Sequence, residues 1–267
     1  MTELARLDQT LSQYVRPETF PLAVRMLKAG EIIPEKAKRP HRDLGVQVTT
    51  CMGYTMARRY GWMLAMAHDD INCPLSKVVY GFEREVEYFT DGCTCAGMYT
   101  ATKEAGAKTE AGIAKFSWKE YETILCAPLS RTSFDPQVIL VYGNSAQVML
   151  LVVAYLYNSG GRLESGFAGR IDCSDSVILT MQSGLPQVIL PCYGDRVFGQ
   201  TQDHEMAFAF PAGDAGRIVE GLEGAYKGGV RYPIPAFMRF QPSYPPSYQK
   251  LEQIWSEGKP ADGLAKP

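Results

Sequence analysis

The sequence carries little net charge and has no long apolar run. Its 27 basic and 29 acidic side chains leave a formal charge of −2 over 267 residues. A broad nucleic-acid surface needs an excess of Lys and Arg, as does a polybasic membrane surface, so we expect neither nucleic acid nor a membrane as a partner. The longest apolar run, residues 146–157, falls short of the ~20 residues of a membrane-spanning helix.

Histidine is scarce, and several familiar motifs are missing. His41, His68 and His204 are the three histidines, and none of them forms a pair with helical metal-binding spacing. The chain holds no CxxC knuckle of the structural zinc type. It also holds neither GxGxxG nor GxxxxGK[ST], so a nucleotide site has no support. The N-terminal residues are too polar for a signal peptide, and we therefore expect a cytoplasmic protein.

Sulfur, by contrast, is abundant, with seven cysteines and eleven methionines. Seven cysteines cannot all pair within one chain, so we expect reduced thiols that are free to pack, react or bind metal. The methionine and aromatic residues between 52 and 66 could line a flat cofactor such as a tetrapyrrole. Their helical spacing favours an ordinary core.

Apolar spacing predicts an alternation of helices and strands. Helices are expected over residues 1–30, with an interruption at Pro17 and Pro21, and over 51–67, 145–157 and 214–226. Thr49 or Thr50 is the expected cap of the second helix, and Asn144 or Ser145 that of the third. Strands are expected over 45–50, 138–142, 187–190 and 205–210, with a loop over 31–43. The Pro- and Tyr-rich tail, 228–267, is expected to be extended, with a short helix around Leu251.

This alternation predicts an α/β or α+β fold with a mixed sheet flanked by helices. The length fits a single domain over residues 1–267. A weak internal echo pairs Cys73-Pro-Leu-Ser with Cys173-Ser-Asp-Ser. Two related βα halves, 15–125 and 126–235, could produce this similarity, but two matches this short could also arise by chance.

A series of short motifs follows a fixed order through residues 15–235. The motifs are Cys51 with Ala57-Arg58-Arg59, Asn72-Cys73-Pro74, Gly81-Phe82, Ala127-Pro128-Leu129, Phe134-Asp135-Pro136, Gly143-Asn144-x-x-Gln147, Cys173, Cys192-Tyr193-Gly194-x-Arg196 and Asp203-x-Glu205-Met206. Their order and spacing resemble those of the DUF169 family. The resemblance implies a shared fold and no known reaction. It also implies a further cysteine in the Cys-Tyr-Gly-Cys-Arg motif, where this chain has Asp195.

The resemblance singles out four family-like cysteines, each beside a turn or a helix start: Cys51, Cys73, Cys173 and Cys192. Soft sulfur donors select iron–sulfur clusters and zinc, and the absence of CxxC knuckles favours a [4Fe–4S] cluster. Helix N-termini would also favour the thiolate form. These four are our predicted metal ligands, with Arg58 and Arg196 as nearby charged residues that bind the cofactor.

A second four-sulfur set is also open. Cys93 and Cys95 lie in a glycine-bracketed turn and could join Cys51 and Cys73 around one metal. Cys126 is expected to belong to the core. Simple packing is the alternative for every one of the cysteines, because free cysteine is among the most buried residue types.

Three functions follow as hypotheses. The first is an iron–sulfur protein in electron transfer or redox catalysis, which would need a redox partner. The second is a binding module for a tetrapyrrole, a corrinoid or another small organic ligand. The third is a thiol enzyme with Cys192 or Cys51 as nucleophile and His204 as base. A homodimer is a mild expectation, since the tail could reach a second subunit.

Overall fold

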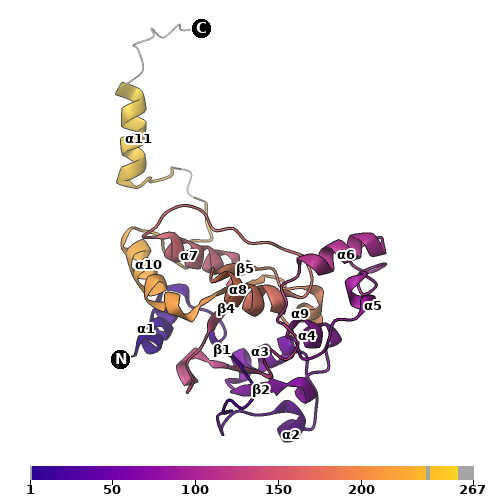
Figure 1. Ribbon diagram of the computed structural model, residues 1–267. Helices are drawn as coiled ribbons and strands as arrows, with labels where there is room; N and C mark the ends of the chain where they lie inside the picture. The colour runs from indigo at the N-terminus through magenta and orange to yellow at the C-terminus, as the bar shows by residue number, and fades with distance from the viewer. Residues whose placement is uncertain (1, 239–240, 258–267) are drawn as a thin grey trace.

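A six-stranded sheet forms the centre of the computed structural model, which describes residues 2–238 and 241–257. The strand order is β2-β3-β1-β4-β6-β5. The strands are β1 (Leu22–Leu27), β2 (Leu64–Ala67), β3 (Thr123–Pro128), β4 (Val138–Asn144), β5 (Gln187–Ile189) and β6 (Glu205–Pro211). The predicted fold class, a sheet flanked by helices, is confirmed (Figure 1). All pairings between these strands are antiparallel, where we expected a mixed sheet.

The described residues form eleven helices. They are α1 (Glu3–Thr10), α2 (Pro40–Leu44), α3 (Thr50–Tyr60), α4 (Pro74–Val79), α5 (Glu87–Thr90), α6 (Lys103–Gly112), α7 (Ser145–Leu156), α8 (Leu179–Ser183), α9 (Tyr193–Val197), α10 (Ala215–Lys227) and α11 (Pro246–Glu257). Two π-helical turns extend this set: Leu11–Val15 continues α1, and Ser174–Ile178 leads into α8. None of the helices in the described part combines the length and apolarity needed to cross a membrane.

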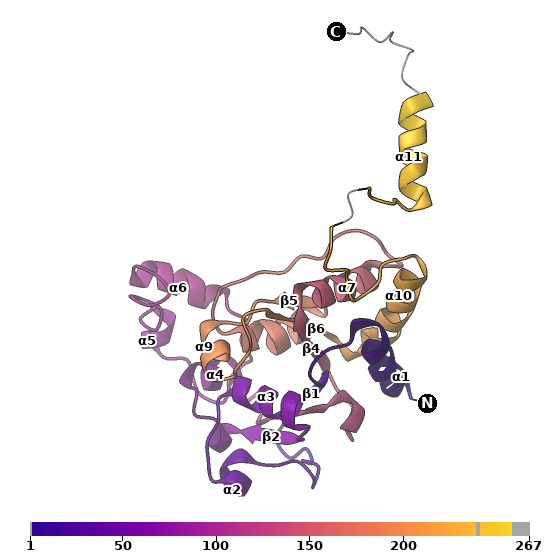
Figure 2. The ribbon, with the colours of Figure 1, turned by 180° about the vertical axis from the view of Figure 1, so that it is seen from behind.

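The two faces of the sheet carry separate apolar cores. Side chains of β1, β4 and β6 alternate between the faces, as expected of strands buried on both sides. Ile139 and Phe208 pack with α1, α7 and α10 on one face. Leu140 and Ala209 pack with α3, α4 and residues 177–178 on the other. The molecule is therefore a helix–sheet–helix sandwich, seen from behind in Figure 2.

The sheet consists of two three-stranded units with one topology. In each unit the third strand lies between the first and the second: β1-β3-β2 and β4-β6-β5. The registers also agree. Leu22 opposes Pro128 just as Val138 opposes Pro211, and Leu64 opposes Cys126, two residues before that proline, just as Gln187 opposes Ala209. The two units meet where β1 pairs with β4.

Glycine caps mark equivalent helices in the two units. Gly61 ends α3 and Gly184 ends α8, both with left-handed backbones and each three residues before its edge strand. In this correspondence Cys173 is the equivalent of Cys51 at the start of α3. The correspondence therefore differs from the sequence echo, which paired Cys173 with Cys73.

Two predicted helices were too long. The helix expected over 1–30 ends with the π-helical turn at Val15, because Pro17 and Pro21 break it, and Leu22–Leu27 is strand β1 with five of its six residues buried. The helix expected over 51–67 ends at Tyr60, where Gly61 adopts φ 73°, and Leu64–Ala67 is strand β2. Thr49 is its cap and accepts a hydrogen bond from the Met52 amide at 3.1 Å.

The remaining element predictions largely held. The expected strand over 45–50 is reduced to one bridge between Val48 and Ile71, and the expected loop over 31–43 contains the start of α2. The other three strands lie where they were predicted, to within two residues. Asn144 caps α7 through the amides of Ala146 and Gln147, whereas Asp214 makes no side-chain cap on α10.

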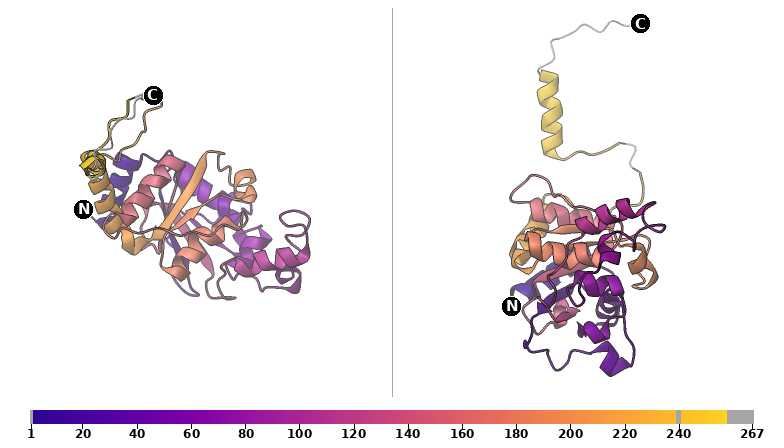
Figure 3. Two further views of the ribbon diagram at one scale, coloured as in Figure 1. Left: turned by 90° about the horizontal axis from the view of Figure 1, so that it is seen from above. Right: turned by 45° about the vertical axis from the view of Figure 1, so that its right-hand side comes forward.

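The tail contains the predicted helix around Leu251, but that helix does not cover the core. In α11, residues 246–257 are all exposed, and the helix stands away from the sandwich in the right-hand view of Figure 3. Residues 239–240 and 258–267 of the tail lie outside the described residues. At the other end of the molecule α5 and α6 form a lobe, far from α1 and α10 (Figure 3).

Candidate functional site

All four family-like cysteines line a single cavity of about 290 Å³. Cys51 lies in the first turn of α3, and Cys73 directly precedes Pro74 at the start of α4. Cys173 precedes the π-helical turn before α8, and Cys192 precedes α9. The predicted location of each cysteine at the start of a helical segment is therefore confirmed.

The repeated topology explains why these cysteines meet. Cys51 and Cys173 begin the helices that end at the two equivalent glycines, Gly61 and Gly184. Cys73 and Cys192 each follow an edge strand, β2 or β5, and directly precede a short helix. Each three-stranded unit thus contributes two thiols from corresponding positions to the same cavity.

Burial raises the pKa of three of these thiols, Cys51, Cys173 and Cys192. It is the main cause that raises the pKa of Cys192 to about 12, with the Asp172 carboxyl adding to the effect. The pKa values of Cys51 and Cys173 are raised for the same reason. For Cys51 and Cys173 this desolvation opposes the thiolate form that a helix N-terminus is expected to favour. The Cys173 pKa is also raised by the other three thiols, which shows that the four share one electrostatic environment.

Two buried carboxyl groups accompany the thiols. Asp172 hydrogen-bonds both the Cys192 thiol and the Asp195 carboxyl, and Asp195 also accepts a hydrogen bond from Thr201 Oγ1 at 2.9 Å. Burial is the main cause that raises the pKa of each carboxyl. Two carboxyls can hydrogen-bond only when they share a proton, so the cavity holds proton donors beside its sulfur atoms.

The thiols are not gathered around a point. Among the described residues, no three His, Cys, Asp or Glu side chains converge closely enough to hold one metal ion. In a tetrahedral zinc site the sulfurs lie roughly 3.8 Å apart, as follows from a Zn–S bond of about 2.3 Å. A cluster of several irons holds its thiolates farther apart than a single ion does. The described side chains therefore contain no preformed site for a single metal ion.

The competing sulfur set is not assembled in the cavity. Cys93 and Cys95 are absent from its lining residues, although Thr94 between them contributes. Cys95 is completely buried and donates its thiol hydrogen bond to Glu110 at 3.3 Å. The Cys93 thiol hydrogen-bonds Lys103. Cys126 is fully buried in the sheet, as expected of a core residue.

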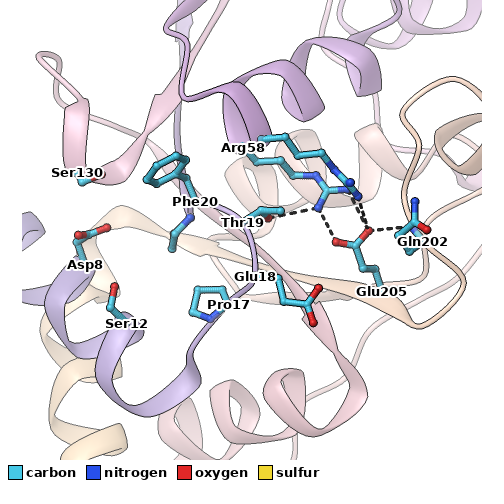
Figure 4. Close-up of a pocket in the computed structure, with 12 residues that line it drawn as sticks. Asp8, Ser12, Pro17, Glu18, Thr19, Phe20, Arg58, Ser130, Gln202 and Glu205 are labelled. Carbon is cyan, nitrogen blue, oxygen red and sulfur yellow. Dashed lines mark hydrogen bonds and ion pairs between the residues drawn. The ribbon is translucent and has the colours of Figure 1, made fainter.

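The two arginines predicted as charge partners lie outside the cavity. Arg58 is fully buried, forms an ion pair with Glu205 at 2.5 Å and packs against the Tyr142 ring at 4.1 Å. It lines a different cavity of about 540 Å³, shown in Figure 4. Arg196 donates to the Gln202 carbonyl at 2.7 Å. Cys51 in the first turn of α3 lines the four-cysteine cavity, whereas Arg58 in the last turn of the same helix lines the other one.

Sequence reasoning missed the basic residue that does line the cavity, Arg170. Arg170 is nearly fully buried and directly precedes Ile171, which has φ 53° and is followed by Asp172 and Cys173. The only available signal was a charged pair, Arg170 and Asp172, flanking Ile171 directly before a candidate cysteine. His204, the base expected in a thiol enzyme, is exposed and is not a lining residue.

Comparison with known proteins gives two matches. The profile of the DUF169 family, described as uncharacterised ArCR, matches residues 10–221 and so includes all four cavity cysteines. An uncharacterised protein of Methanocaldococcus jannaschii, MJ0308, is 30% identical over 205 residues, which cover 76% of this chain and 86% of that protein. No solved structure matches. The family profile spans both three-stranded units and the cavity between them, and the chain therefore belongs to the DUF169 family.

Proposed function

We propose that this protein binds an iron–sulfur cluster in the four-cysteine cavity and acts in electron transfer or redox catalysis in the cytoplasm. The ligands would be the four family-like cysteines. One observation carries the proposal: four cysteines from four separate segments, two from each three-stranded unit, line the same cavity. Packing alone gives no reason for thiols to recur at corresponding positions beside one cavity.

The chemistry of the cavity is compatible with this group. Thiolate sulfur is the usual ligand of iron–sulfur clusters, and a bound cluster would supply one-electron transfer. Each thiol must lose its proton to become a ligand, so the raised pKa values of Cys51, Cys173 and Cys192 oppose loading at low pH. The buried guanidinium of Arg170 would offset part of the negative charge.

Anaerobic purification followed by iron and acid-labile sulfide analysis tests the proposal. We expect equal amounts of iron and sulfide, four of each per chain, with visible charge-transfer absorption. Cys51→Ser and Cys173→Ser should each lower the iron content severalfold. Cys93→Ser is the matched control, because it removes a half-buried thiol outside the cavity and separates the two four-sulfur sets.

The outcomes differ for the competing sets and functions. If Cys93→Ser loses the iron and Cys173→Ser retains it, the ligands would instead be the second four-sulfur set, Cys51, Cys73, Cys93 and Cys95. A folded wild-type protein that holds no iron after anaerobic purification and anaerobic cluster reconstitution would overturn the proposal. An organic chromophore without sulfide would identify a binding module.

A small-molecule binding module is the second candidate function. The cavity's volume of about 290 Å³ is at the lower end of ligand pockets, which typically measure about 300–1,000 Å³. Leu75, Met98 and Phe198 supply an apolar lining. This size favours a ligand smaller than a tetrapyrrole or a corrinoid.

The thiol enzyme has less geometric support, because His204 lies outside the cavity and the thiol pKa values are raised. Alkylation titration tests it: one thiol that reacts far faster than the rest would favour a nucleophile. A redox partner and a homodimer stay predictions that accompany the main proposal, and light scattering of the purified chain measures the latter.

A further inference from the structure

Arg170 is held in the wall of the four-cysteine cavity by groups behind it. Its side chain is 1% exposed, and Nη1 forms an ion pair with Glu110 Oε1 at 3.0 Å. The same nitrogen contacts the Cys95 thiol. The guanidinium lies 4.9 Å from the centre of the Tyr99 ring, which also lines the cavity. These contacts fix the position of the guanidinium and use only one of its edges.

The other edge has no partner. Nε and Nη2 of Arg170 are both buried, and neither has a hydrogen-bond acceptor among the described residues. Leaving a buried charged donor unpaired is costly, so an arginine placed this way is typical of a site that receives an acceptor. The Nε and Nη2 hydrogens are parallel, and together they match the two oxygens of a carboxylate.

Nothing else in the cavity lining offers a positive charge. Arg170 is the single basic side chain among the lining residues, which otherwise comprise thiols, hydroxyls, two carboxyls and apolar groups. The next residue, Ile171, holds φ 53°, a conformation that a β-branched residue adopts only when its surroundings enforce it. The chain is thus constrained where it presents Arg170 to the cavity.

We propose that Arg170 is the anion-binding residue of this cavity, and that its ligand is a small organic carboxylate bound side-on through Nε and Nη2. The apolar body of the ligand would lie against Leu75 and Met98, beside the thiols. This inference rests on the proposed ligand-binding role of the cavity, but it requires no metal. It assigns the substrate class whether the thiols hold a cluster or contact the substrate themselves.

Thermal unfolding with two matched probes tests the inference. Sodium propionate carries the carboxylate, and propionamide has nearly the same shape without the charge; sodium chloride keeps the ionic strength constant. We expect the Tm of the full chain to rise with the logarithm of propionate concentration and to stay unchanged with propionamide. Arg170→Lys keeps a charge but loses the paired donors, and should weaken the apparent propionate affinity at least tenfold.

Arg84→Lys is the matched control, because Arg84 is exposed and stacks on Trp118 away from the cavity. It should behave as wild type. Equal responses to propionate and propionamide, or an unchanged propionate response in Arg170→Lys, would overturn the inference. If Arg170→Lys does not fold, the alkylation rates of Cys173 and Cys192 in the wild-type protein provide the test. Iodoacetate should alkylate these thiols faster than iodoacetamide does, and propionate should slow the iodoacetate reaction. Faster alkylation by iodoacetamide would overturn the inference.

Iron analysis of the same preparations separates the two proposals. Iron-free protein that binds propionate through Arg170 would overturn the cluster proposal and support the carboxylate site. Iron-loaded protein whose Tm does not change with propionate would support the cluster and overturn the carboxylate site.

Discussion

Arg58 and Glu205 form an ion pair that is almost entirely withdrawn from water. The side chains are 0% and 6% exposed, and both guanidinium Nη atoms donate to the carboxylate. Arg58 also packs against the Tyr142 ring, so the pair connects α3 to β4 and β6. A buried charge that loses its partner is strongly destabilising, whereas an exposed pair contributes little.

We therefore expect Glu205→Gln to lower the free energy of unfolding by about 3–5 kcal/mol. Glu223→Gln is the control, because Glu223 pairs with Arg6 near the surface, where side-chain exposures are 32% and 52%. That change should cost at most about 1 kcal/mol. Urea denaturation of the three proteins measures both effects, and equal losses would contradict the expectation.

The same carboxylate should make stability depend on pH. Burial alone would raise the pKa of Glu205, but hydrogen bonds from Arg58 and the Gln202 amide lower it below its ordinary value of 4.5. A carboxylate with a lowered pKa in the folded state stabilises the protein above its unfolded-state pKa and loses that effect as pH falls. The stability gap between wild type and Glu205→Gln should thus be full at pH 7 and shrink below pH 4.5. A gap that widens in acid would refute this sign.

At the element scale, α3 shows where apolar spacing misleads. Met63 and Met66 continue the helical periodicity of the segment after Cys51, yet Gly61 ends the helix and Leu64–Ala67 pairs with β3. Short apolar runs do not distinguish a strand from a helix turn, and the long-range partner decides. The strand Val138–Asn144 was recognisable because its β-branched run is followed by a capping residue, Asn144.

The equivalent glycine in the other unit gives a prediction for this scale. Gly184 has φ 65° with no atom near its missing Cβ, so Gly184→Ala introduces backbone strain without a clash. We expect a loss of about 1–2 kcal/mol in the free energy of unfolding. Gly112→Ala is the control: it lies in α6 with ordinary φ and open space, and should be neutral or stabilise by up to about 1 kcal/mol. Chemical denaturation checks both, and a neutral Gly184→Ala would show that the cap relaxes.

At the scale of the whole molecule, the two three-stranded units share their cores. Leu22 of β1 packs in one cluster with Ile178 and Ala209, and its neighbour Ala23 packs in another with Phe208 and Leu222. β1 and β4 also pair across the junction. Neither half, 15–125 or 126–235, buries its own apolar faces alone.

We therefore expect the chain to unfold in one transition. Of the three tryptophans, Trp62 and Trp118 lie in the first half and Trp255 lies exposed in α11. With Trp255 replaced by Phe, tryptophan fluorescence reports on the first half, and far-UV circular dichroism reports on both halves. The two urea curves should coincide. Separate midpoints would show instead that the halves are independent domains.

The sequence by itself determined the helix-and-sheet class and the strands with β-branched runs, and its resemblance to the DUF169 family singled out four cysteines beside turns or helix starts. The class and the strands depend on local propensity, capping and turn chemistry, which act over a few residues. The tertiary structure alone decided that these four thiols share one cavity, that Arg58 turns away toward Glu205, and that Arg170 lines the cavity instead. The reason is that burial and partner choice arise between segments more than a hundred residues apart, where local sequence carries no distance information.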